Sequence, residues 1–322
     1  MTGAPRRVTV APPAKINLSL RVLDRRADGY HELRTVFQTI SLTDRLSIEF
    51  RPGGGQRVEL ESSLDIPAQD NLVVRAAHAV MGAAAIRGHV RFRLEKRIPA
   101  GGGLGGGSSD AAAVLLALPA LAGRRLELDV LAGLAAGLGS DVPFFLLGGT
   151  AVGLGRGTEV YPLPDLPRLP GLLVLPAVSL STAEAYRALD ELTPPSATCH
   201  TKSFHVLTWC MGHGLTADNW SGLGENDFEP YAFERHPELG RIARRLRRCG
   251  ALPAMMSGSG SSLFGLFRNR EDVERARASF RGLRCESFYL VSRGRYRKTW
   301  WQGLMGHLQG GEQWPPRSRY VR

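Results

Sequence analysis

The sequence predicts an α+β fold of two domains, and three observations lead to this prediction. The chain has 322 residues, more than a single hydrophobic core usually holds. Residues 8–22 and 36–50 show the alternation and β-branched content of strands, separated by turn residues at 24–29, which indicates an antiparallel start. A proline-rich segment at 161–170 is typical of a domain boundary, and beyond it strand and helix patterns alternate.

The composition is that of an ordinary globular protein. Hydrophobic residues make up 43% and charged residues 22%, which excludes disorder throughout the chain. No charged and apolar signal pattern precedes Pro12, and the longest apolar stretch, 111–122, is short for a membrane span and carries Pro119. We therefore expect a cytoplasmic protein with no membrane partner.

The net charge of +11 lies largely at the C-terminus. Seven basic residues and one acidic residue place +6 of it on residues 293–322. With three tryptophans nearby, this basic tail has the composition of a segment that contacts nucleic acid or anionic lipid. A poorly ordered polar terminus is the simpler interpretation. The remaining charge suits a protein that handles anionic nucleotides, and we expect no nucleic-acid partner.

The four cysteines form no Cys-x-x-Cys pair and are too few to cross-link a chain of this length. Residues 199–213 gather Cys199, His200, His205, Cys210 and His213, but these spacings fit no standard zinc module. We expect reduced thiols and no protein-bound metal site.

The first domain continues with a helix, a strand and two further helices. Asp70 and Asn71 form an N-cap before the periodic run 72–81, which Gly82 closes. Residues 90–94 alternate as a strand, and a glycine-rich run then leads into a helix at 110–118. The next helix, at 130–138, follows without an intervening strand.

The second domain has a compact alternating pattern, which is typical of a ferredoxin-like α+β unit. Its predicted elements are a strand at 172–175, a helix at 182–189, an irregular segment at 193–224, a helix at 238–248, a strand before a Ser/Gly loop, a strand at 263–267, a helix at 271–280 and a strand at 286–291.

The glycine-rich run is the strongest chemical signal in the sequence. Six glycines occupy the seven positions 101–107, so the backbone lacks the Cβ atoms that would keep a ligand away. The following helix directs unpaired N–H groups and its positive dipole end toward the same place. Ser108 and Ser109 add hydroxyl groups that can donate to phosphate or bind magnesium. A flexible linker fits poorly, because a linker need not lie between a strand and an amphipathic helix.

Three classes of anion-binding loop compete for this run. A Walker A loop is excluded, because no lysine lies between Gly101 and Ser109. A dinucleotide fingerprint can be read at Gly101, Gly103 and Gly106, with Glu127 or Asp129 beyond it, but that motif requires a parallel βαβ unit. The third class has the pattern Pro-x-x-x-Gly-Leu-Gly-Ser-Ser. The stretch 99–109 resembles its longer form, Pro-x-Gly-Gly-Gly-Leu-Gly-Gly-Gly-Ser-Ser.

This longer loop is the form found in the diphosphocytidyl-methylerythritol kinases of the GHMP kinase superfamily, and other segments resemble the same family in the same order. They are the first motif at 13–18, the substrate-side turn at 26–31, the second motif at 98–113, the catalytic aspartate segment at 138–144, the acidic stretch at 225–229 and the third, glycine-rich motif at 257–262. Residues 198–223 and the tail after 293 depart from the family pattern, and neither has an assigned role.

The resemblance implies a two-domain GHMP kinase fold, with an N-terminal ribosomal-protein-S5-like α/β domain and a C-terminal ferredoxin-like domain. We place these domains at residues 1–165 and 166–292, followed by the basic tail 293–322. The implied activity is ATP-dependent phosphorylation of the 2-hydroxyl of 4-diphosphocytidyl-2-C-methyl-D-erythritol in the non-mevalonate isoprenoid precursor pathway. The implied cofactors are ATP and Mg²⁺, the partner is this small-molecule substrate, and the assembly is a monomer or homodimer.

Other functions remain open at this point. Within the superfamily, the alternative is a kinase of the homoserine or mevalonate type. A basic protein that binds nucleic acid through its loops and a nicotinamide-dependent dehydrogenase are alternatives from other classes.

The resemblance places the catalytic residues at Asp141 and Lys15. Asp141 is the candidate base that accepts the proton of the acceptor hydroxyl. From spacing alone, an N-cap at an ordinary helix start is the more common explanation of Asp141. Lys15 lies on the polar face of a predicted strand, where its ammonium can stabilise Asp141 and the acceptor alkoxide. Asn17, on the same face, is expected to orient the substrate.

The remaining candidate residues fall into two groups. The nucleotide group consists of Pro99, Ala100, Gly101, Gly102, Gly103, Leu104, Gly105, Gly106, Gly107, Ser108 and Ser109, with Asn71 and Lys96 near the adenine. The substrate group consists of Asn17, Tyr30, His31, Tyr186, Ser257, Gly258, Ser259 and Gly260. The resemblance implies that Tyr30 and His31 bind the cytidine, with Tyr186 as the opposing aromatic wall.

Overall fold

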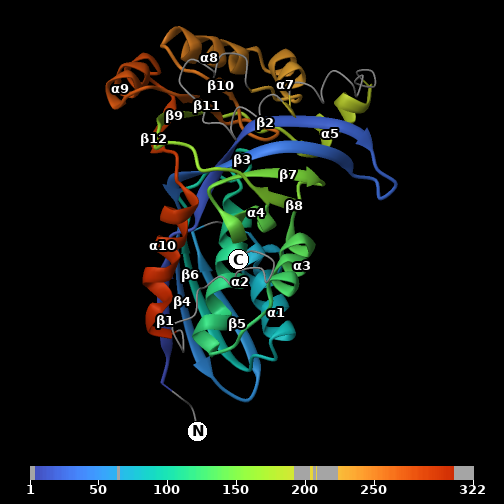
Figure 1. Ribbon diagram of the computed structural model, residues 1–322, viewed down its shortest axis with the longest axis vertical. Helices are drawn as coiled ribbons and strands as arrows, with labels where there is room; N and C mark the ends of the chain where they lie inside the picture. Colours follow the sequence, from blue (N-terminus) through green and yellow to red (C-terminus); the bar gives the residue numbers. More distant parts are fainter. Residues whose placement is uncertain (1–3, 64–65, 192–203, 206–207, 209–223, 308–322) are drawn as a thin grey trace.

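The computed structural model describes residues 4–63, 66–191, 204–205, 208 and 224–307. Figure 1 shows an elongated molecule with helices α7 (Glu229–Arg235), α8 (Pro237–Arg248) and α9 (Arg270–Ser279) at one end and the N-terminus at the other. Three four-stranded sheets lie between these ends. Among the described residues, no helix is both long enough and apolar enough to cross a membrane.

The sheet nearest the N-terminus has the order β1-β4-β6-β5. Its strands are β1 (Arg6–Val10), β4 (Arg45–Pro52), β6 (Gly88–Glu95) and β5 (Gln56–Ser62). Only the β5–β6 pair is parallel. One face packs on helices, because alternate residues of β6 are buried, and the opposite face carries pairs such as Arg91 with Glu59. This sheet therefore has one solvated side.

The helices of the first half lie on the buried side of this sheet. They are η1 (Ala68–Asp70), α1 (Leu72–Ala83), α2 (Gly106–Ala122) and α3 (Leu128–Leu138). The predicted N-cap is confirmed, since the Asn71 side chain accepts a hydrogen bond from the Val73 amide at 3.0 Å. Helix α2 is buried on nearly all sides, which explains its continuous apolar sequence.

The second sheet has the order β2-β3-β7-β8 and crosses the middle of the molecule (Figure 1). It consists of β2 (Pro13–Arg25), β3 (His31–Thr43), β7 (Thr150–Gly155) and β8 (Glu159–Pro162). The short helix α4 (Val142–Leu147) leads into β7. The β2 and β3 strands pair antiparallel, as predicted for the start of the chain.

The third sheet has the order β10-β11-β9-β12 and is fully antiparallel. Its strands are β9 (Pro170–Leu175), β10 (Ala254–Met256), β11 (Leu263–Leu266) and β12 (Arg284–Tyr289), and helix α5 (Thr182–Glu191) follows β9. With α8 between β9 and β10 and α9 between β11 and β12, the unit has β-α-β-β-α-β order. The ferredoxin-like prediction is confirmed.

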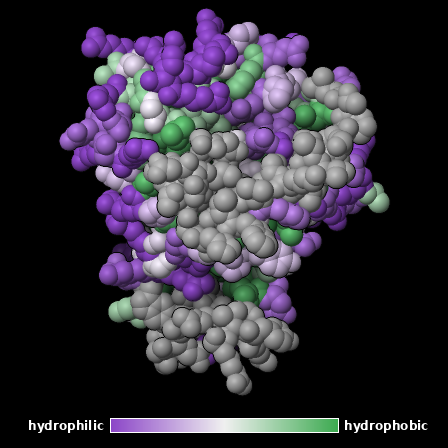
Figure 2. Space-filling view, turned by 45° about the horizontal axis from the view of Figure 1, so that its top comes forward, coloured by the Kyte–Doolittle hydropathy of each residue, from purple (hydrophilic) through white to green (hydrophobic). Residues whose placement is uncertain are grey.

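Helix α8 shows why the outer surface of this unit is polar. Leu239, Ile242, Ala243 and Leu246 are buried against the sheet. The arginines between them are exposed, and hydrophilic residues dominate much of the face seen in Figure 2.

Two predicted strands are each divided in the structure. The predicted strand 8–22 separates into β1 and β2, which belong to different sheets, because Pro12 and Pro13 lack the amide donors that a continuous ladder needs. The predicted strand 36–50 divides at Asp44, whose carboxylate accepts the amides of Arg97 and Ile98 at 2.6 and 2.8 Å. Both breaks move the chain from one sheet to the next.

The expectation of a poorly ordered basic tail is wrong for residues 293–307. They form α10 (Arg293–Leu304) and η3 (Met305–His307). Tyr296, Trp300 and Leu304 recur every four residues and are buried, so one face of α10 belongs to the core. Residues 308–322 and most of 198–223 lie outside the described residues. The predicted domain boundary at 165 falls between β8 and β9 and stays a prediction.

Candidate active site

The glycine run forms a sharp loop that ends in helix α2. Gly101, Gly103 and Gly105 all have positive φ, between 68° and 74°, which L side chains rarely adopt. Gly106 and Gly107 already belong to α2, which therefore begins earlier than the predicted residue 110. The first amides of this helix have no intrahelical acceptors and are available to an anion.

A cavity of about 350 Å³ lies along this loop. It is lined by residues of the nucleotide group, namely Pro99, Ala100, Gly101, Gly102, Gly103, Leu104, Gly105, Gly106, Gly107, Ser108, Asn71 and Lys96. Ser109 is the exception, because it is buried and lines neither this cavity nor the next one.

A second glycine-rich loop, residues 257–262, packs against the first. The Ser257 hydroxyl donates to the carbonyl of Gly103 at 2.9 Å. A Cβ atom on Gly103 would lie 2.0 Å from the carbonyl oxygen of Ser257, so the contact requires glycine. The Asn226 amide donates to the carbonyls of Met256 and Gly258 at 2.9 and 2.8 Å and fixes the second loop.

Asp141 and Lys15 face each other beside the first loop. The Lys15 ammonium lies 3.2 Å from the Asp141 carboxylate and donates to the Asn17 side chain at 2.7 Å. Asn17 in turn donates to Thr35 at 2.7 Å. The Lys15 amide donates to the carbonyl of Leu104 at 3.0 Å, which ties strand β2 to the glycine loop.

The side chain of Asp141 does not cap a helix. Asp141 directly precedes α4 but makes no side-chain hydrogen bond to the α4 amides. The alternative explanation of Asp141 as an ordinary N-cap is therefore wrong. Its carboxylate is directed instead to Lys15 and to the adjoining cavity.

This second cavity has a volume of about 680 Å³. The predicted residues that line it are Lys15, Asn17, Tyr30, His31, Asp141, Tyr186, Gly258 and Ser259. The predicted residues Ser257 and Gly260 do not line it. It shares Gly101, Gly103, Gly105 and Ser108 with the cavity along the first loop. The two cavities therefore meet at the glycine loop, beside the Lys15–Asp141 pair.

An aromatic wall closes one side of the larger cavity. The rings of His31 and Tyr186 stack with centroids 4.8 Å apart, and Phe228 contacts Tyr186 edge to face. Burial, together with the charge of Asp141, raises the pKa of Tyr186 to about 12, so its hydroxyl stays protonated at neutral pH. His31 contacts the Asp190 carboxylate through Nε2 at 2.6 Å, which fixes the plane of the imidazole ring.

Tyr30 and Tyr186 both line the larger cavity, and the role of Tyr186 as the opposing aromatic wall stays a prediction. Tyr30 is 53% exposed at the rim of the cavity, where the Arg156 guanidinium lies 4.5 Å from its ring centroid. Tyr186 stacks on His31 within the same cavity.

Several lining residues escaped the sequence interpretation. Arg25, Arg156 and Arg187 line the larger cavity with Lys15 and make it suitable for an anionic ligand, and Asp190 orients His31. Asp190 stands four residues after Tyr186, which places both on one face of α5, but that spacing alone does not single it out. Single arginines in loops and on helix faces are common, so only the fold reveals this group.

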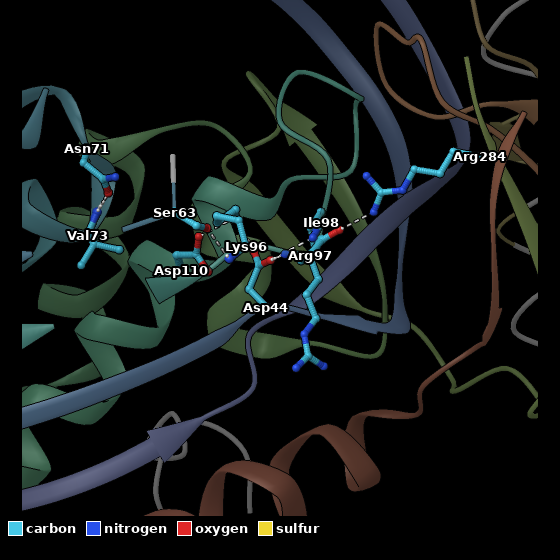
Figure 3. A network of polar contacts seen from close by, with 9 residues as sticks. All are labelled: Asp44, Ser63, Asn71, Val73, Lys96, Arg97, Ile98, Asp110 and Arg284. Carbon is cyan, nitrogen blue, oxygen red and sulfur yellow. Dashed lines mark hydrogen bonds and ion pairs between the residues drawn. The ribbon is translucent and has the colours of Figure 1, made fainter. Parts of the chain in front are cut away.

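Lys96 belongs to a buried ionic network at the edge of the nucleotide cavity (Figure 3). Its ammonium contacts the carboxylates of Asp44 and Asp110, the latter at 2.7 Å. Burial by itself would lower the pKa of Lys96, but the two carboxylates outweigh it and raise that pKa. The ammonium predicted to approach the adenine is therefore already paired with protein carboxylates.

Asp110 is incompletely paired within this network. Burial and the charge of Asp44 raise the pKa of Asp110 to about 7, although Lys96 opposes the shift. Its second oxygen, Oδ1, is buried without a hydrogen-bond partner among the described residues. One ammonium serves two carboxylates, and the Asp110 carboxyl is expected to release its proton near neutral pH instead of in the acidic range.

The described part of the chain contains no group of three or more His, Cys, Asp or Glu side chains placed to hold a metal ion. Of the cluster at 199–213, only His205 lies within the described residues. The rejected zinc site is thus outside what the structure describes.

Comparisons with known proteins agree with this geometry. The family models for the GHMP kinases N terminal domain and GHMP kinases C terminal match residues 71–149 and 211–283. A curated 4-diphosphocytidyl-2-C-methyl-D-erythritol kinase from Solibacter usitatus is 52% identical over 312 residues, covering 95% of this chain and 96% of its own. One from Pelotomaculum thermopropionicum is 42% identical over 289 residues, covering 89% and 97%.

Solved structures share the architecture. A crystal structure of 4-(cytidine 5'-diphospho)-2C-methyl-D-erythritol kinase has a TM-score of 0.72 at 38% identity, covering 88% of this chain and 99% of that chain. A homoserine kinase from Cytophaga hutchinsonii has a TM-score of 0.69 at 18% identity, covering 89% and 95%, which shows a common fold alone.

Proposed function

The chain belongs to the GHMP kinase family, and from this premise we propose that it transfers the γ-phosphoryl group of ATP to the 2-hydroxyl of 4-diphosphocytidyl-2-C-methyl-D-erythritol. The single observation that carries the proposal is the meeting of two cavities at one glycine loop, with Asp141 and Lys15 beside the junction. Phosphoryl transfer needs a donor and an acceptor held in line on either side of the transferred group. The loop provides such a junction.

The smaller cavity suits the polyphosphate of ATP. Its lining includes glycine backbone without Cβ atoms and the N-terminus of α2, both of which favour phosphate oxygens. The Ser108 hydroxyl lines both cavities. Because Mg²⁺ bound to nucleotides takes one or two protein oxygens and several phosphate and water oxygens, this hydroxyl fits a magnesium-bound nucleotide. When bound, the ion neutralises charge on the phosphates.

The larger cavity suits the cytidine-bearing alcohol. Its volume of about 680 Å³ lies within the range of about 300–1,000 Å³ that small-molecule sites occupy. The His31–Tyr186 wall offers an aromatic face to a base, and the arginines at its rim suit a diphosphate. The curated relatives described above carry the name of this activity.

The chemistry follows from the two charged groups at the junction. Asp141 accepts the proton of the acceptor hydroxyl as its oxygen attacks the γ-phosphorus, and the bond to the β-phosphate oxygen breaks to release ADP. Lys15 stabilises the negative charge that develops on the acceptor oxygen. Asn17 holds the Lys15 ammonium in place, and Thr35 holds Asn17.

The setting of the enzyme is part of the same proposal. We place it in the cytoplasm, where ATP is available, as a monomer or homodimer in the supply of isoprenoid precursors. The partner is the small-molecule substrate, with no nucleic acid or membrane.

A coupled assay for ADP release tests the proposed substrate. Purified protein is supplied with Mg-ATP and, separately, 4-diphosphocytidyl-2-C-methyl-D-erythritol, homoserine and mevalonate. We expect turnover with the first acceptor only, and a phosphate on its 2-hydroxyl by NMR. Turnover with homoserine or mevalonate, or none with the cytidine compound, overturns the assignment.

A further inference from the structure

Helix α10 connects the end of the chain to the first half of the molecule. It runs along the side of β1 and also contacts α2 (Figure 1). Tyr296, Trp300 and Leu304 form its buried face within the large N-terminal core. Trp300 and Leu304 provide apolar contact with this core, whereas Tyr296 also brings a hydroxyl group into it.

The first turn of α10 packs against the end of α4. The Tyr296 hydroxyl donates to the carbonyl of Phe145, one of the last carbonyls of α4 and thus without an intrahelical partner. The Tyr296 ring fills the space beside Gly148, where a Cβ atom would lie 2.1 Å from it. Burial raises the pKa of Tyr296, so the hydroxyl remains a donor.

Arg293 closes the turn that follows α4. Its guanidinium donates to the carbonyls of Thr150 and Leu163, the latter at 3.2 Å. A Cβ atom on Gly149 would lie 2.7 Å from the Arg293 Cβ. Residues 148–150 are therefore packed directly against the start of α10.

Helix α4 carries the active-site carboxylate at its opposite end. Asp141 immediately precedes it, and the helix has only 6 residues. A helix this short does not hold itself in place, so its position depends on tertiary contacts. The ring of Phe145 also touches the glycine loop, since a Cβ atom on Gly105 would lie 3.0 Å from it. Phe145 thus contacts α10 through its carbonyl and the glycine loop through its ring.

We propose that α10 positions Asp141 for catalysis through the Tyr296–Phe145 contact, with Tyr296 as a positioning residue. The inference rests on the proposed function, because it takes Asp141 as the proton acceptor. Without the hydroxyl, the Phe145 carbonyl is buried and unpaired, and α4 moves to find another partner. Asp141 moves with it relative to Lys15. Tyr296 lines neither cavity, so the affinities for nucleotide and acceptor stay unchanged.

The test compares Tyr296→Phe with Leu304→Ala. The first variant removes a single oxygen, whereas the second removes apolar packing at the far end of the same helix. Steady-state kinetics with both substrates and amide hydrogen exchange over residues 141–148 are measured for the wild type and both variants. All measurements are made well below the melting temperature of each of these proteins.

For Tyr296→Phe, we expect kcat to fall about tenfold, KM for both substrates to stay within about twofold, and exchange over 141–148 to accelerate. Leu304→Ala is expected to lower the melting temperature while kcat stays within about twofold. The proposal is overturned if Tyr296→Phe keeps kcat or its exchange rates, or if Leu304→Ala lowers kcat equally. The exchange comparison does not depend on the acceptor, so it separates a failure of this inference from a failure of the proposed function.

Discussion

At the scale of single residues, Lys15 and Asp141 are in contact but differ in how deeply each side chain is buried. The Lys15 side chain is 3% exposed, whereas that of Asp141 is 31% exposed. The ammonium is thus fixed by the carboxylate, by Asn17 and by the ring of Phe37, while the carboxylate remains open to the cavity. This asymmetry suits an immobile cation beside a proton acceptor that a substrate can reach.

Asp141→Asn is expected to lower kcat by roughly two to four orders of magnitude, because the amide cannot accept the hydroxyl proton. ATP affinity is expected to persist, since Asp141 does not line the nucleotide cavity. Turnover and calorimetric titration with an ATP analogue measure the two effects. Asp129→Asn, an exposed aspartate on α3, is the matched control with unchanged kinetics. Near-native turnover of Asp141→Asn would refute its role as the base.

We expect Asp110 to make the stability of the protein depend on pH. Its pKa is about 7 in the folded state, against roughly 3.9 in an unfolded chain. Between these values the folded state binds more protons, so the free energy of unfolding falls as pH rises, by up to about 1.4 kcal/mol per pH unit. Above pH 7 this contribution levels off.

We expect Asp110→Asn to flatten this dependence. Urea unfolding at several pH values from about 5 to about 8, for the wild type and the variant, gives the difference directly. The same series on Asp129→Asn should run parallel to the wild type. If Asp110→Asn also runs parallel to it, the buried carboxyl group does not titrate in this range.

Among single residues, the sequence singled out candidates that belong to long motifs and did not single out cavity-lining residues that stand alone. Asp141 could not be distinguished from an N-cap by spacing, and its role was inferred from resemblance. Asp190 and Arg156 reach the cavity from a helix and a loop, and no local pattern marks them. Their role depends on how distant segments meet, which a single sequence does not encode locally.

At the scale of elements, the two glycine-rich loops act as one structure. Their closest contact is between Gly103 and Ser257, from different halves of the chain. Each loop restricts the other, so the backbone amides of the first loop are preorganised for the phosphates that we propose it binds. The loops therefore need glycine for two reasons, the positive φ and the close approach.

Gly103→Ala and Gly101→Ala separate these two reasons. Both positions have positive φ, 74° and 70°, so each alanine is expected to cost about 1–2 kcal/mol of stability. Only at Gly103 does the new Cβ meet the other loop, which costs a further ~1–3 kcal/mol and weakens ATP binding. Urea unfolding and ATP titration report both effects. Equal losses for the two variants would show that the contact between the loops is unimportant.

Elements with strong local signals were predicted well, and those fixed by tertiary contacts were not. Helix α1 has both end signals, and α8 has a clear amphipathic period, so both agree with the structure within a few residues. Helix α10 was missed because its buried face, Tyr296, Trp300 and Leu304, is hidden among arginines and lysine. The division of the first strands was missed because the alternation continues across Pro12 and Asp44.

At the scale of the whole molecule, one hydrophobic cluster joins the two predicted domains. It contains Ile16, Leu18 and Ile40 from the second sheet, and Leu173, Phe264 and Phe288 from the third. Strand β2 also pairs with the chain at Asn226, and Ile40 pairs with Leu290. The interface is apolar and continuous, unlike the polar contacts between independent domains.

We therefore expect one cooperative unfolding transition for the whole chain. Scanning calorimetry should give a single endotherm, with equal calorimetric and van't Hoff enthalpies. Phe288→Ala, at a buried position of the shared cluster, is expected to shift the whole transition and cost about 3–5 kcal/mol. Two endotherms, or a shift confined to part of the unfolding, would show that the halves unfold separately.

The glycine loop also bears on how this architecture can change its chemistry. Among the described residues, Gly101, Gly103, Gly105 and Ser108 line both cavities, and each other lining residue belongs to one of the two cavities alone. Under the proposed function, replacements among Tyr30, His31, Arg156 and Tyr186 are therefore expected to change which alcohol is accepted without disturbing the phosphate donor. Acceptor preference can then be redesigned within the larger cavity, while the residues of the glycine loop that line both cavities stay unchanged.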